Sequence, residues 1–215
     1  MNVDLSLNTR ERLGVFGGSF DPPHLAHRAL ALAAIETLGL DELRIVPTGQ
    51  AWHKARLLSP PEHRLAMTRL AFQDLPRAVV DERELQRSGP TFTIDTLEAL
   101  QAEQPDAQLY LIMGADQFAA FHQWHRWQAI IEVAIICIAG RALATPADAE
   151  FDAHIEFEHR LVRLPMLPMP VSATEIRRRV ASAAQKLPEI TDTITDMVSE
   201  PVARYISINR LYTTP

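Results

Sequence analysis

Short apolar runs alternate with longer segments of helical periodicity along most of this chain. The runs that we expect to form strands span residues 12–16, 42–47, 78–81, 109–113, 134–139 and 161–164. The segments that we expect to form helices span residues 25–38, 60–73, 93–103, 116–133, 173–184 and 202–212. The apolar runs are continuous rather than alternating with polar residues, which is typical of parallel strands covered on both faces. The pattern therefore predicts an α/β fold built on a doubly wound parallel sheet.

The length of the chain indicates a single domain. A chain of 215 residues suffices for one well-buried α/β domain and is short for two. Residues 1–11 are expected to form a flexible lead-in, and residues 142–159, which are alanine-rich and acidic, are expected to lie on the surface. We therefore expect one domain over residues 1–215, with a C-terminal helical part from about residue 173.

Composition and charge narrow the possible functions. A net charge of −6 argues against a surface devoted to nucleic acid or to an anionic membrane, but it permits a small basic pocket for one nucleotide. The only cysteine, Cys137, lies in an apolar run, so we expect a buried, inert thiol. The chain begins without a signal-peptide pattern, and its longest apolar stretch, residues 134–139, is too short to cross a bilayer. A cytoplasmic location is therefore expected.

The most distinctive loops all follow expected strands directly. They span residues 17–27, 50–54, 114–116, 140–141 and 170–177. Ligands of doubly wound sheets bind beyond the carboxyl ends of the strands, where the strand order switches. We therefore expect these loops to converge on one crevice.

The first of these loops, GGSFDPPHLAH, has the composition of a phosphate site. Gly17 and Gly18 permit close approach of the backbone to a phosphate, and the following helix start supplies unpaired N–H groups. Asp21 is expected to cap the turn, and His24 and His27 lie on one face of the first helical turn. Both imidazoles are suited to donate hydrogen bonds to phosphate oxygens in a transition state.

Two other interpretations of this loop have weaker support. A zinc site is conceivable because the H-x-x-H pattern occurs twice, at His24/His27 and His122/His125, but no spaced cysteines or H-E-x-x-H context accompany it. A dehydrogenase is disfavoured because the first strand is not followed by G-x-G-x-x-G.

A second stretch, VSATEIRRR, opens the helix expected at residues 173–184. Ser172 and Glu175 have the spacing of a capping box, and Thr174 adds a second hydroxyl. Of the three arginines 177–179, we expect one to contact a phosphate and two to be solvated. Hydroxyls, free N–H groups and a guanidinium at a helix start are what a triphosphate requires.

Together, the two stretches resemble those of nucleotidyltransferases of the HxGH superfamily, and within it the bacterial nicotinate-nucleotide adenylyltransferases. Three further segments share this resemblance: VPTGQAWHK at 46–54, TFTIDTL at 91–97 and GADQF…FHQW at 114–124. The chain departs from the usual motifs at Ala26, where the family has glycine, and at Ala173, where serine is frequent.

The resemblance implies a Rossmann-like nucleotidyltransferase fold and transfer of AMP from ATP to nicotinate mononucleotide, giving nicotinate adenine dinucleotide and pyrophosphate. Since the attacking phosphate is already ionised, in-line positioning and charge neutralisation suffice. It implies that His24 and His27 hold the phosphates, with His27 on the α-phosphate, and that Arg177 binds the leaving pyrophosphate. Magnesium is expected as Mg²⁺ carried by the ATP phosphates.

The same resemblance assigns the remaining site residues. Residues implied to bind ATP and its phosphates are Gly17, Gly18, Ser19, Phe20, Ser172, Thr174, Gly114, Asp116, Gly140 and Arg141. For nicotinate mononucleotide, Trp124 is expected to stack on the pyridine ring, and N–H groups near Thr93 and His125 to meet its carboxylate. Lys54 is expected either to close over the phosphates or to be a solvated loop cation.

Alternative functions remain open at this point. Another acceptor in the same superfamily, such as nicotinamide mononucleotide, phosphopantetheine or glycerol phosphate, would use the same phosphate motifs. A fragment of a tRNA-charging ligase would require a KMSKS-like loop and a basic surface, which the sequence lacks. A non-catalytic nucleotide sensor would not require both motifs. The sequence also leaves open whether the chain forms a homo-oligomer.

Overall fold

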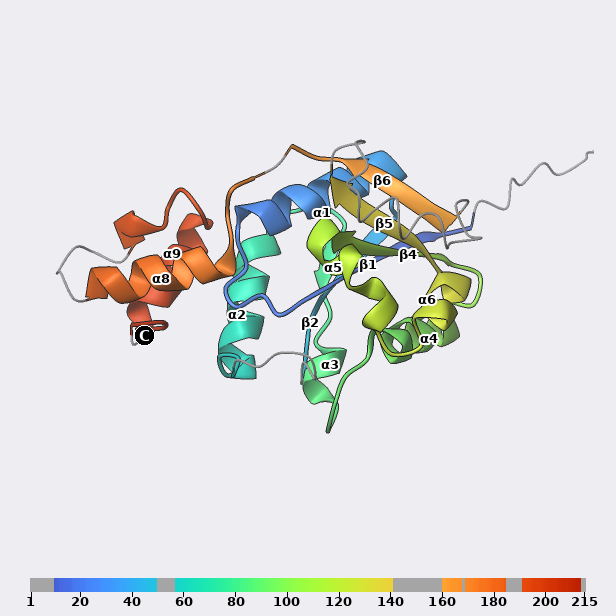
Figure 1. Ribbon diagram of the computed structural model, residues 1–215, viewed down its shortest axis with the longest axis horizontal. Helices are drawn as coiled ribbons and strands as arrows, with labels where there is room; N and C mark the ends of the chain where they lie inside the picture. The colour runs from blue at the N-terminus through green and yellow to red at the C-terminus, as the bar shows by residue number, and fades with distance from the viewer. Residues whose placement is uncertain (1–9, 50–56, 141–159, 168, 185–190, 214–215) are drawn as a thin grey trace, which may run out of the picture.

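The computed structural model describes residues 10–49, 57–140, 160–167, 169–184 and 191–213. Six parallel strands form one sheet in the order β3-β2-β1-β4-β5-β6 (Figure 1). The strands are β1 (Arg12–Gly18), β2 (Glu42–Pro47), β3 (Ala78–Val80), β4 (Gln108–Gly114), β5 (Ala134–Gly140) and β6 (Leu161–Pro165). The predicted single domain with a doubly wound parallel sheet is confirmed.

The switch in strand order lies at β1, in the middle of the sheet. β1 pairs with β2 on one side and with β4 on the other, so that Phe16 is in register with Ile45 and with Ile112. Chain connections leave this point in opposite directions along the sheet. The loops after β1 and β4 therefore border a crevice at the carboxyl ends of the strands.

Helices cover both faces of the sheet. One face packs against α1 (Leu25–Leu38) and α2 (Pro61–Phe72), and the same hydrophobic core continues into the C-terminal α8 (Ala173–Ala184) and α9 (Glu200–Ile208), of which α9 packs against α2. The other packs against α4 (Thr93–Glu103), α5 (Ala115–Ala119) and α6 (Trp127–Val133). Neighbouring residues of one strand, such as Val15 and Phe16, belong to opposite cores, which explains why the apolar runs are continuous.

Three predicted boundaries differ from the structure. The helix expected at 116–133 is divided into α5, a 3₁₀ turn η1 (Phe121–Gln123) and α6, because Arg126 adopts a left-handed backbone with φ 53°. A short helix α3 (Arg83–Gln86), which was not predicted, lies between the strand expected at 78–81 and the helix expected at 93–103. The last helix ends at Ile208, and Tyr212, predicted to be its last residue, is left-handed with φ 59°.

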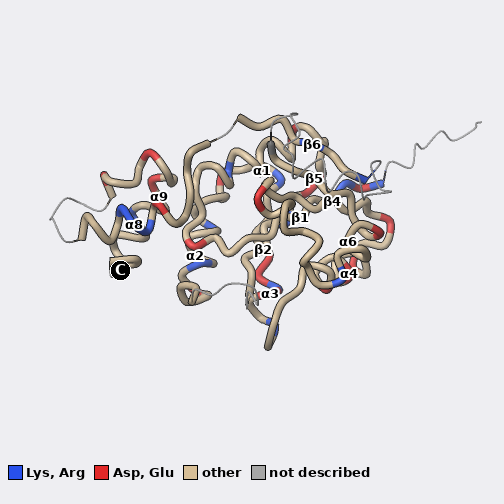
Figure 2. The backbone as a smooth tube through the Cα atoms, viewed as in Figure 1, with Lys and Arg blue, Asp and Glu red and all other residues tan. Residues whose placement is uncertain are grey.

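Charged residues of both signs occur on the helices and connecting segments, and the arginines near the start of α8 form one blue stretch (Figure 2). Within the described ranges, no helix combines the length and apolar character needed to span a membrane. Residues 1–9 of the lead-in, the segment 142–159 and the expected loop 50–54 fall outside the described residues.

Candidate active site

The carboxyl end of β1 presents open backbone at Gly17 but not at Gly18. A Cβ built on Gly17 would meet nothing within 4 Å, so this side of the backbone is accessible to a ligand. A Cβ on Gly18 would lie 2.9 Å from the ring of Phe20, which is itself buried. A side chain at position 18 would therefore displace Phe20 from the core beneath the loop.

His24 and His27 lie against each other at the start of α1. Their rings are stacked with centroids 3.6 Å apart, and the backbone N–H of His24 donates to Nδ1 of His27 over 3.2 Å. Since Nδ1 of His27 is an acceptor, the neutral ring carries its proton on Nε2. The Nε2–H group is then the donor that His27 offers to a ligand.

His24 is the more deeply buried of the two rings, with 8% of its surface exposed. Its Nδ1 atom is buried and has no hydrogen-bond partner among the described residues. Burial lowers the pKa of His24 to about 4, so the ring is neutral at pH 7. A buried ring nitrogen in this state is suited to exchange a hydrogen bond with a ligand oxygen.

Asp21 does not cap the first turn as expected, because His24 occupies the N-cap position of α1. The buried Asp21 carboxylate instead accepts from the N–H of Ser59 over 3.2 Å and from the hydroxyl of Tyr212 over 2.6 Å. Its backbone carbonyl accepts from Nη1 of Arg177 over 2.7 Å. Asp21 thus connects the histidine loop with three other parts of the chain.

The start of α8 faces this loop through one of its three arginines. Arg177 also donates to Oγ1 of Thr174 over 3.1 Å, whereas Arg178 and Arg179 both bind the carboxylate of Glu175. These ion pairs lower the pKa of Glu175 to about 2. The predicted cap is present in part, because the N–H of Glu175 donates to Ser172 Oγ over 3.2 Å, while the Glu175 carboxylate is engaged by arginines.

A cavity of about 360 Å³ opens beside the histidine loop, between β1, β4 and α4. Seven of the predicted site residues line it: Gly17, Gly18, Ser19, Thr93, Asp116, Trp124 and His125. Its volume lies within the range of small-molecule sites, which is roughly 300–1,000 Å³. The sequence pattern therefore identified much of the wall of this cavity.

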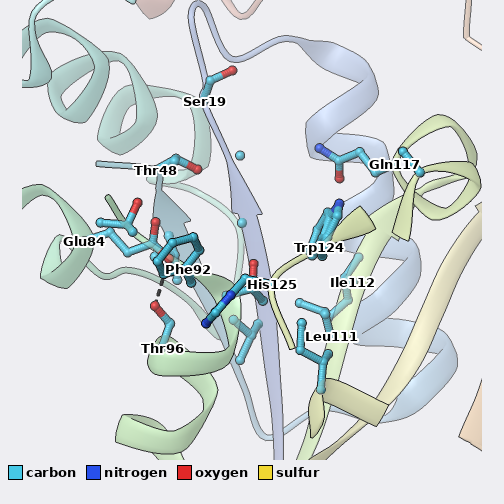
Figure 3. A pocket seen from close by; sticks show the side chains of 18 of the residues that line it. Ser19, Thr48, Glu84, Phe92, Thr96, Leu111, Ile112, Gln117, Trp124 and His125 are labelled. Atoms are coloured by element: carbon cyan, nitrogen blue, oxygen red, sulfur yellow. Dashed lines mark hydrogen bonds between the residues drawn. The ribbon is translucent and has the colours of Figure 1, made fainter. Parts of the chain in front are cut away.

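Aromatic side chains from two elements face each other across the cavity (Figure 3). Trp124 lies on one side, supported edge-on by the buried Phe121 at a centroid distance of 5.5 Å. Phe92 and His125 form a second pair, with ring centroids 4.4 Å apart and an interplanar angle of 36°. A flat heteroaromatic ring is the kind of ligand that such walls bind.

A buried carboxylate that sequence reasoning missed, Glu84 of α3, lines the same cavity (Figure 3). Thr96 Oγ1 donates to Glu84 Oε1 over 2.8 Å, and Thr91 and the backbone of Gly49 also hydrogen-bond to the carboxylate. Burial raises the pKa of Glu84. The TFTIDTL segment contains both threonines, but no local pattern pointed to their acidic partner.

Arg64 of α2 is a second residue that sequence reasoning missed. It is 1% exposed, and its guanidinium donates to the carbonyl oxygens of Ser19, Thr48 and Ser59 over 3.1, 2.7 and 3.1 Å. It thereby joins the histidine loop to the end of β2. The helical spacing of Arg64 with the buried Met67 places it on the inner face of α2, and that spacing is visible in the sequence.

The other predicted site residues that the structure describes lie outside the lining of the cavity. His24, His27 and Phe20 belong to the adjoining loop and helix start, and Ser172, Thr174 and Arg177 to the region where α8 approaches that loop. Gly114 and Gly140 are the last residues of β4 and β5. Lys54 and Arg141 fall outside the described residues.

Comparison with known proteins connects these features to a family. Residues 15–179 match the family described as cytidylyltransferase-like. A protein of Albidiferax ferrireducens named probable nicotinate-nucleotide adenylyltransferase is 53% identical over 95% of this chain and 99% of its own. A Bordetella petrii protein of the same name is 42% identical over 94% of this chain and 99% of its own.

A solved structure has the same fold. The Plasmodium falciparum nicotinic acid mononucleotide adenylyltransferase complexed with NaAD matches with a TM-score of 0.74, over 96% of this chain and 99% of that one. The sequence identity is 21%, so this likeness concerns the fold alone.

Proposed function

The chain belongs to the nicotinate-nucleotide adenylyltransferases within the cytidylyltransferase-like family, and on this premise we propose that it transfers AMP from ATP to nicotinate mononucleotide. The products are nicotinate adenine dinucleotide and pyrophosphate. One observation carries the assignment of roles: Arg177 of α8 is bonded to Asp21 in the histidine loop, beside the aromatic cavity. This contact supports assigning the two phosphate motifs to one site.

The reaction is a displacement at the α-phosphorus. An oxygen of the acceptor's 5′-phosphate bonds to that phosphorus while the bond to the pyrophosphate oxygen breaks, and the leaving group takes the electron pair. The acceptor oxygen is already ionised at neutral pH, so no side chain has to remove a proton. Catalysis then consists of aligning two anionic reactants and neutralising the charge that develops between them.

The histidine loop would hold the reacting phosphates. His27 donates from Nε2 to the α-phosphate, in keeping with the acceptor role of its Nδ1. The neutral His24 ring, which burial keeps uncharged, contacts a neighbouring phosphate oxygen. The backbone at Gly17 and Gly18 and the following Ser19 and Phe20 shape the floor on which the phosphates lie.

The start of α8 would take the leaving pyrophosphate. Arg177 supplies the charge, and the hydroxyls of Ser172 and Thr174 with the first N–H groups of the twelve-residue helix supply hydrogen bonds. At the ATP side of the crevice we assign Gly114, Asp116, Gly140 and Arg141 to the nucleotide. These four positions follow or end strands β4 and β5.

The aromatic cavity would take nicotinate mononucleotide. Trp124 stacks on the pyridine ring, and N–H groups near Thr93 and His125 receive its carboxylate. Backbone donors favour a carboxylate over an amide, since an amide presents its own N–H₂ group to one of them. Lys54 is assigned to the 5′-phosphate of this substrate.

Magnesium would enter as part of the ATP substrate. Within the described part of the chain, no group of three or more His, Cys, Asp or Glu side chains is arranged to hold a metal ion. Mg²⁺ prefers oxygen ligands and usually keeps several waters, so we assign its coordination mainly to phosphate oxygens and water. The protein's part is then to hold the phosphates that carry it.

The proposed location of the protein is the cytoplasm, and the formation of a homo-oligomer stays a prediction.

The proposed activity is tested by supplying the purified chain with MgATP and one acceptor at a time, and by identifying the product and the pyrophosphate. We expect nicotinate mononucleotide to be used best. If nicotinamide mononucleotide or phosphopantetheine were converted preferentially, that compound would be the acceptor instead of nicotinate mononucleotide. If no acceptor led to release of pyrophosphate, the proposed activity would be refuted.

A further inference from the structure

We infer that Tyr212, near the end of the chain, is a positioning residue for the ATP-binding half of the site and acts through Asp21. The inference rests on the proposed function, because it requires Arg177 and the histidine loop to bind the phosphates of ATP. Figure 1 shows the C-terminal end of the chain beside α8, whose first residues would take the pyrophosphate.

The contact between Tyr212 and Asp21 is short and largely buried. The tyrosine hydroxyl donates to Asp21 Oδ1 over 2.6 Å, and the aspartate is 1% exposed. Burial and the neighbouring carboxylate both raise the pKa of Tyr212, so the phenol stays protonated and remains a donor. The two residues are 191 positions apart in the sequence, so this is a tertiary link rather than a local turn.

The backbone of Tyr212 indicates that this placement is enforced by tertiary contacts. Its φ of 59° lies in the left-handed region, which side-chain-bearing residues rarely adopt, at a cost on the order of 1 kcal/mol. Packing of its ring against the core of α1, α2 and α9 and the bond to Asp21 offset that cost. The chain is thereby held where its hydroxyl meets the carboxylate.

Asp21 connects Tyr212 to both parts of the proposed phosphate site, the histidine loop and the start of α8. Its second carboxylate oxygen accepts from the N–H of Ser59, and its carbonyl oxygen accepts from Arg177. The catalytic candidate His24 follows three residues later in the same loop. Loss of the tyrosine hydroxyl would leave one oxygen of a buried carboxylate short of a donor, and the loop would shift to recover it.

The cavity for the pyridine nucleotide is set apart from this link. Neither Tyr212 nor Asp21 lines the cavity, whereas Ser19 at its rim is held by Arg64. Disturbing Tyr212 should therefore affect ATP more than the acceptor. That difference distinguishes a positioning role from a general contribution to folding.

The chain offers a matched control in Tyr205. This residue also bonds through its hydroxyl to a side chain distant in sequence, with 3.0 Å between Tyr205 Oη and His63 Nδ1, but it connects α9 to α2 without contacting Asp21. Tyr205→Phe and Tyr212→Phe each remove one oxygen atom and retain the ring. Tyr205→Phe deletes the bond to His63. Tyr212→Phe deletes the bond to Asp21, together with the hydroxyl's hydrogen bond to Ser59 and its longer contact with Met67 Sδ at 3.9 Å.

The experiment titrates each full-length variant with MgATP in a calorimeter, and then measures KM for both substrates. We expect Tyr212→Phe to weaken MgATP binding about tenfold and to raise the KM for ATP similarly, with the KM for nicotinate mononucleotide changed less than twofold. Tyr205→Phe should leave all three within twofold of the wild type. Thermal unfolding of each variant reports the loss of stability separately.

Two results would overturn the inference. One is MgATP binding by Tyr212→Phe within twofold of the wild type, whatever happens to its unfolding temperature. The other is equal weakening of both substrates, or an equal effect from Tyr205→Phe, since a general loss of structure acts that way. The titration needs no acceptor, so a failure of the proposed transfer reaction leaves this comparison intact.

Discussion

Arg177 and Asp21 are 156 residues apart in sequence, yet the guanidinium of one donates to the backbone carbonyl of the other over 2.7 Å. Arg177 lies near the start of α8, and Asp21 lies between the end of β1 and the N-cap of α1. The contact therefore brings together two helix starts, and the start of a helix favours phosphate through its N–H groups and its dipole. A triphosphate spanning both would have its reacting phosphorus at the histidines and its leaving group at the arginine.

The first prediction concerns the charge at Arg177. Replacing it by lysine retains the positive charge but removes the planar fork that contacts Asp21 and Thr174 together. We expect kcat/KM to fall about 100-fold, the size of effect typical for loss of one oriented donor. Arg178→Lys is the control, since Arg178 is exposed and bonded to Glu175, and it should change kcat/KM less than twofold. Equal values of kcat/KM for the two variants would show that Arg177 does not bind the substrate phosphates.

The second prediction concerns pH and His24. Its pKa is lowered from 6.5 in the unfolded chain to about 4 in the folded protein, so the unfolded state binds the proton first as pH falls. The contribution of His24 to stability is thus fully present above pH 6.5 and is lost between there and pH 4, by about 3 kcal/mol. Urea unfolding at several pH values should show that His24→Asn flattens this dependence. The control variant His122→Asn, at an exposed histidine, should keep the pH dependence of the wild type. The same pH dependence of the free energy of unfolding in the wild type and in His24→Asn would contradict the lowered pKa of His24.

The third prediction concerns Glu84 in the cavity wall. Glutamine retains the size of the side chain but offers one acceptor oxygen to donors from Thr91, Thr96 and Gly49. The wall that carries Thr93 should loosen, and we expect the KM for nicotinate mononucleotide to rise about tenfold with the KM for ATP unchanged. Glu82→Gln, at a residue of the surface pair with Arg69, serves as control. A rise in both KM values, or in neither, would contradict this role.

The fourth prediction concerns Arg64. A lysine there cannot reach the carbonyl oxygens of Ser19, Thr48 and Ser59 at once, so buried acceptors would lose their partners. We expect Arg64→Lys to lower the free energy of unfolding by about 2–3 kcal/mol. Arg69→Lys, on the same helix but exposed, should change it by less than about 0.5 kcal/mol. Urea unfolding measures both, and equal losses would indicate that Arg64 is an ordinary surface cation.

Local pattern predicted the elements that carry strong periodicity. The helices at 25–38 and 93–103 end where predicted, because Gly39 and Pro105 follow them, and the helix at 173–184 begins where predicted, after Ser172. The segment 116–133 was wrong as one helix. Its apolar residues suit a helix throughout, but the helix is interrupted by the tertiary packing of Phe121 and Trp124 and by the left-handed backbone of Arg126.

The candidate site divides in a similar way. The residues of the two motifs and Trp124 are recognisable because they are local in sequence. Asp21 was expected to cap the turn before the first helix. Its bonds to Ser59 and Tyr212 depend instead on the packing of α2 and of the C-terminal end of the chain. Arg64 and Glu84 are polar residues buried by the fold, and a sequence pattern does not reveal which distant backbone groups will pair with them.

The role of His27 in phosphate transfer is tested most directly by the rate of nicotinate adenine dinucleotide formation with both substrates saturating. His27→Ala removes the Nε2 donor assigned to the α-phosphate, whereas His122→Ala removes an exposed imidazole that does not line the cavity. We predict a fall of at least about 100-fold for His27→Ala and less than twofold for His122→Ala. A His27→Ala rate within a few-fold of the wild type would contradict the account.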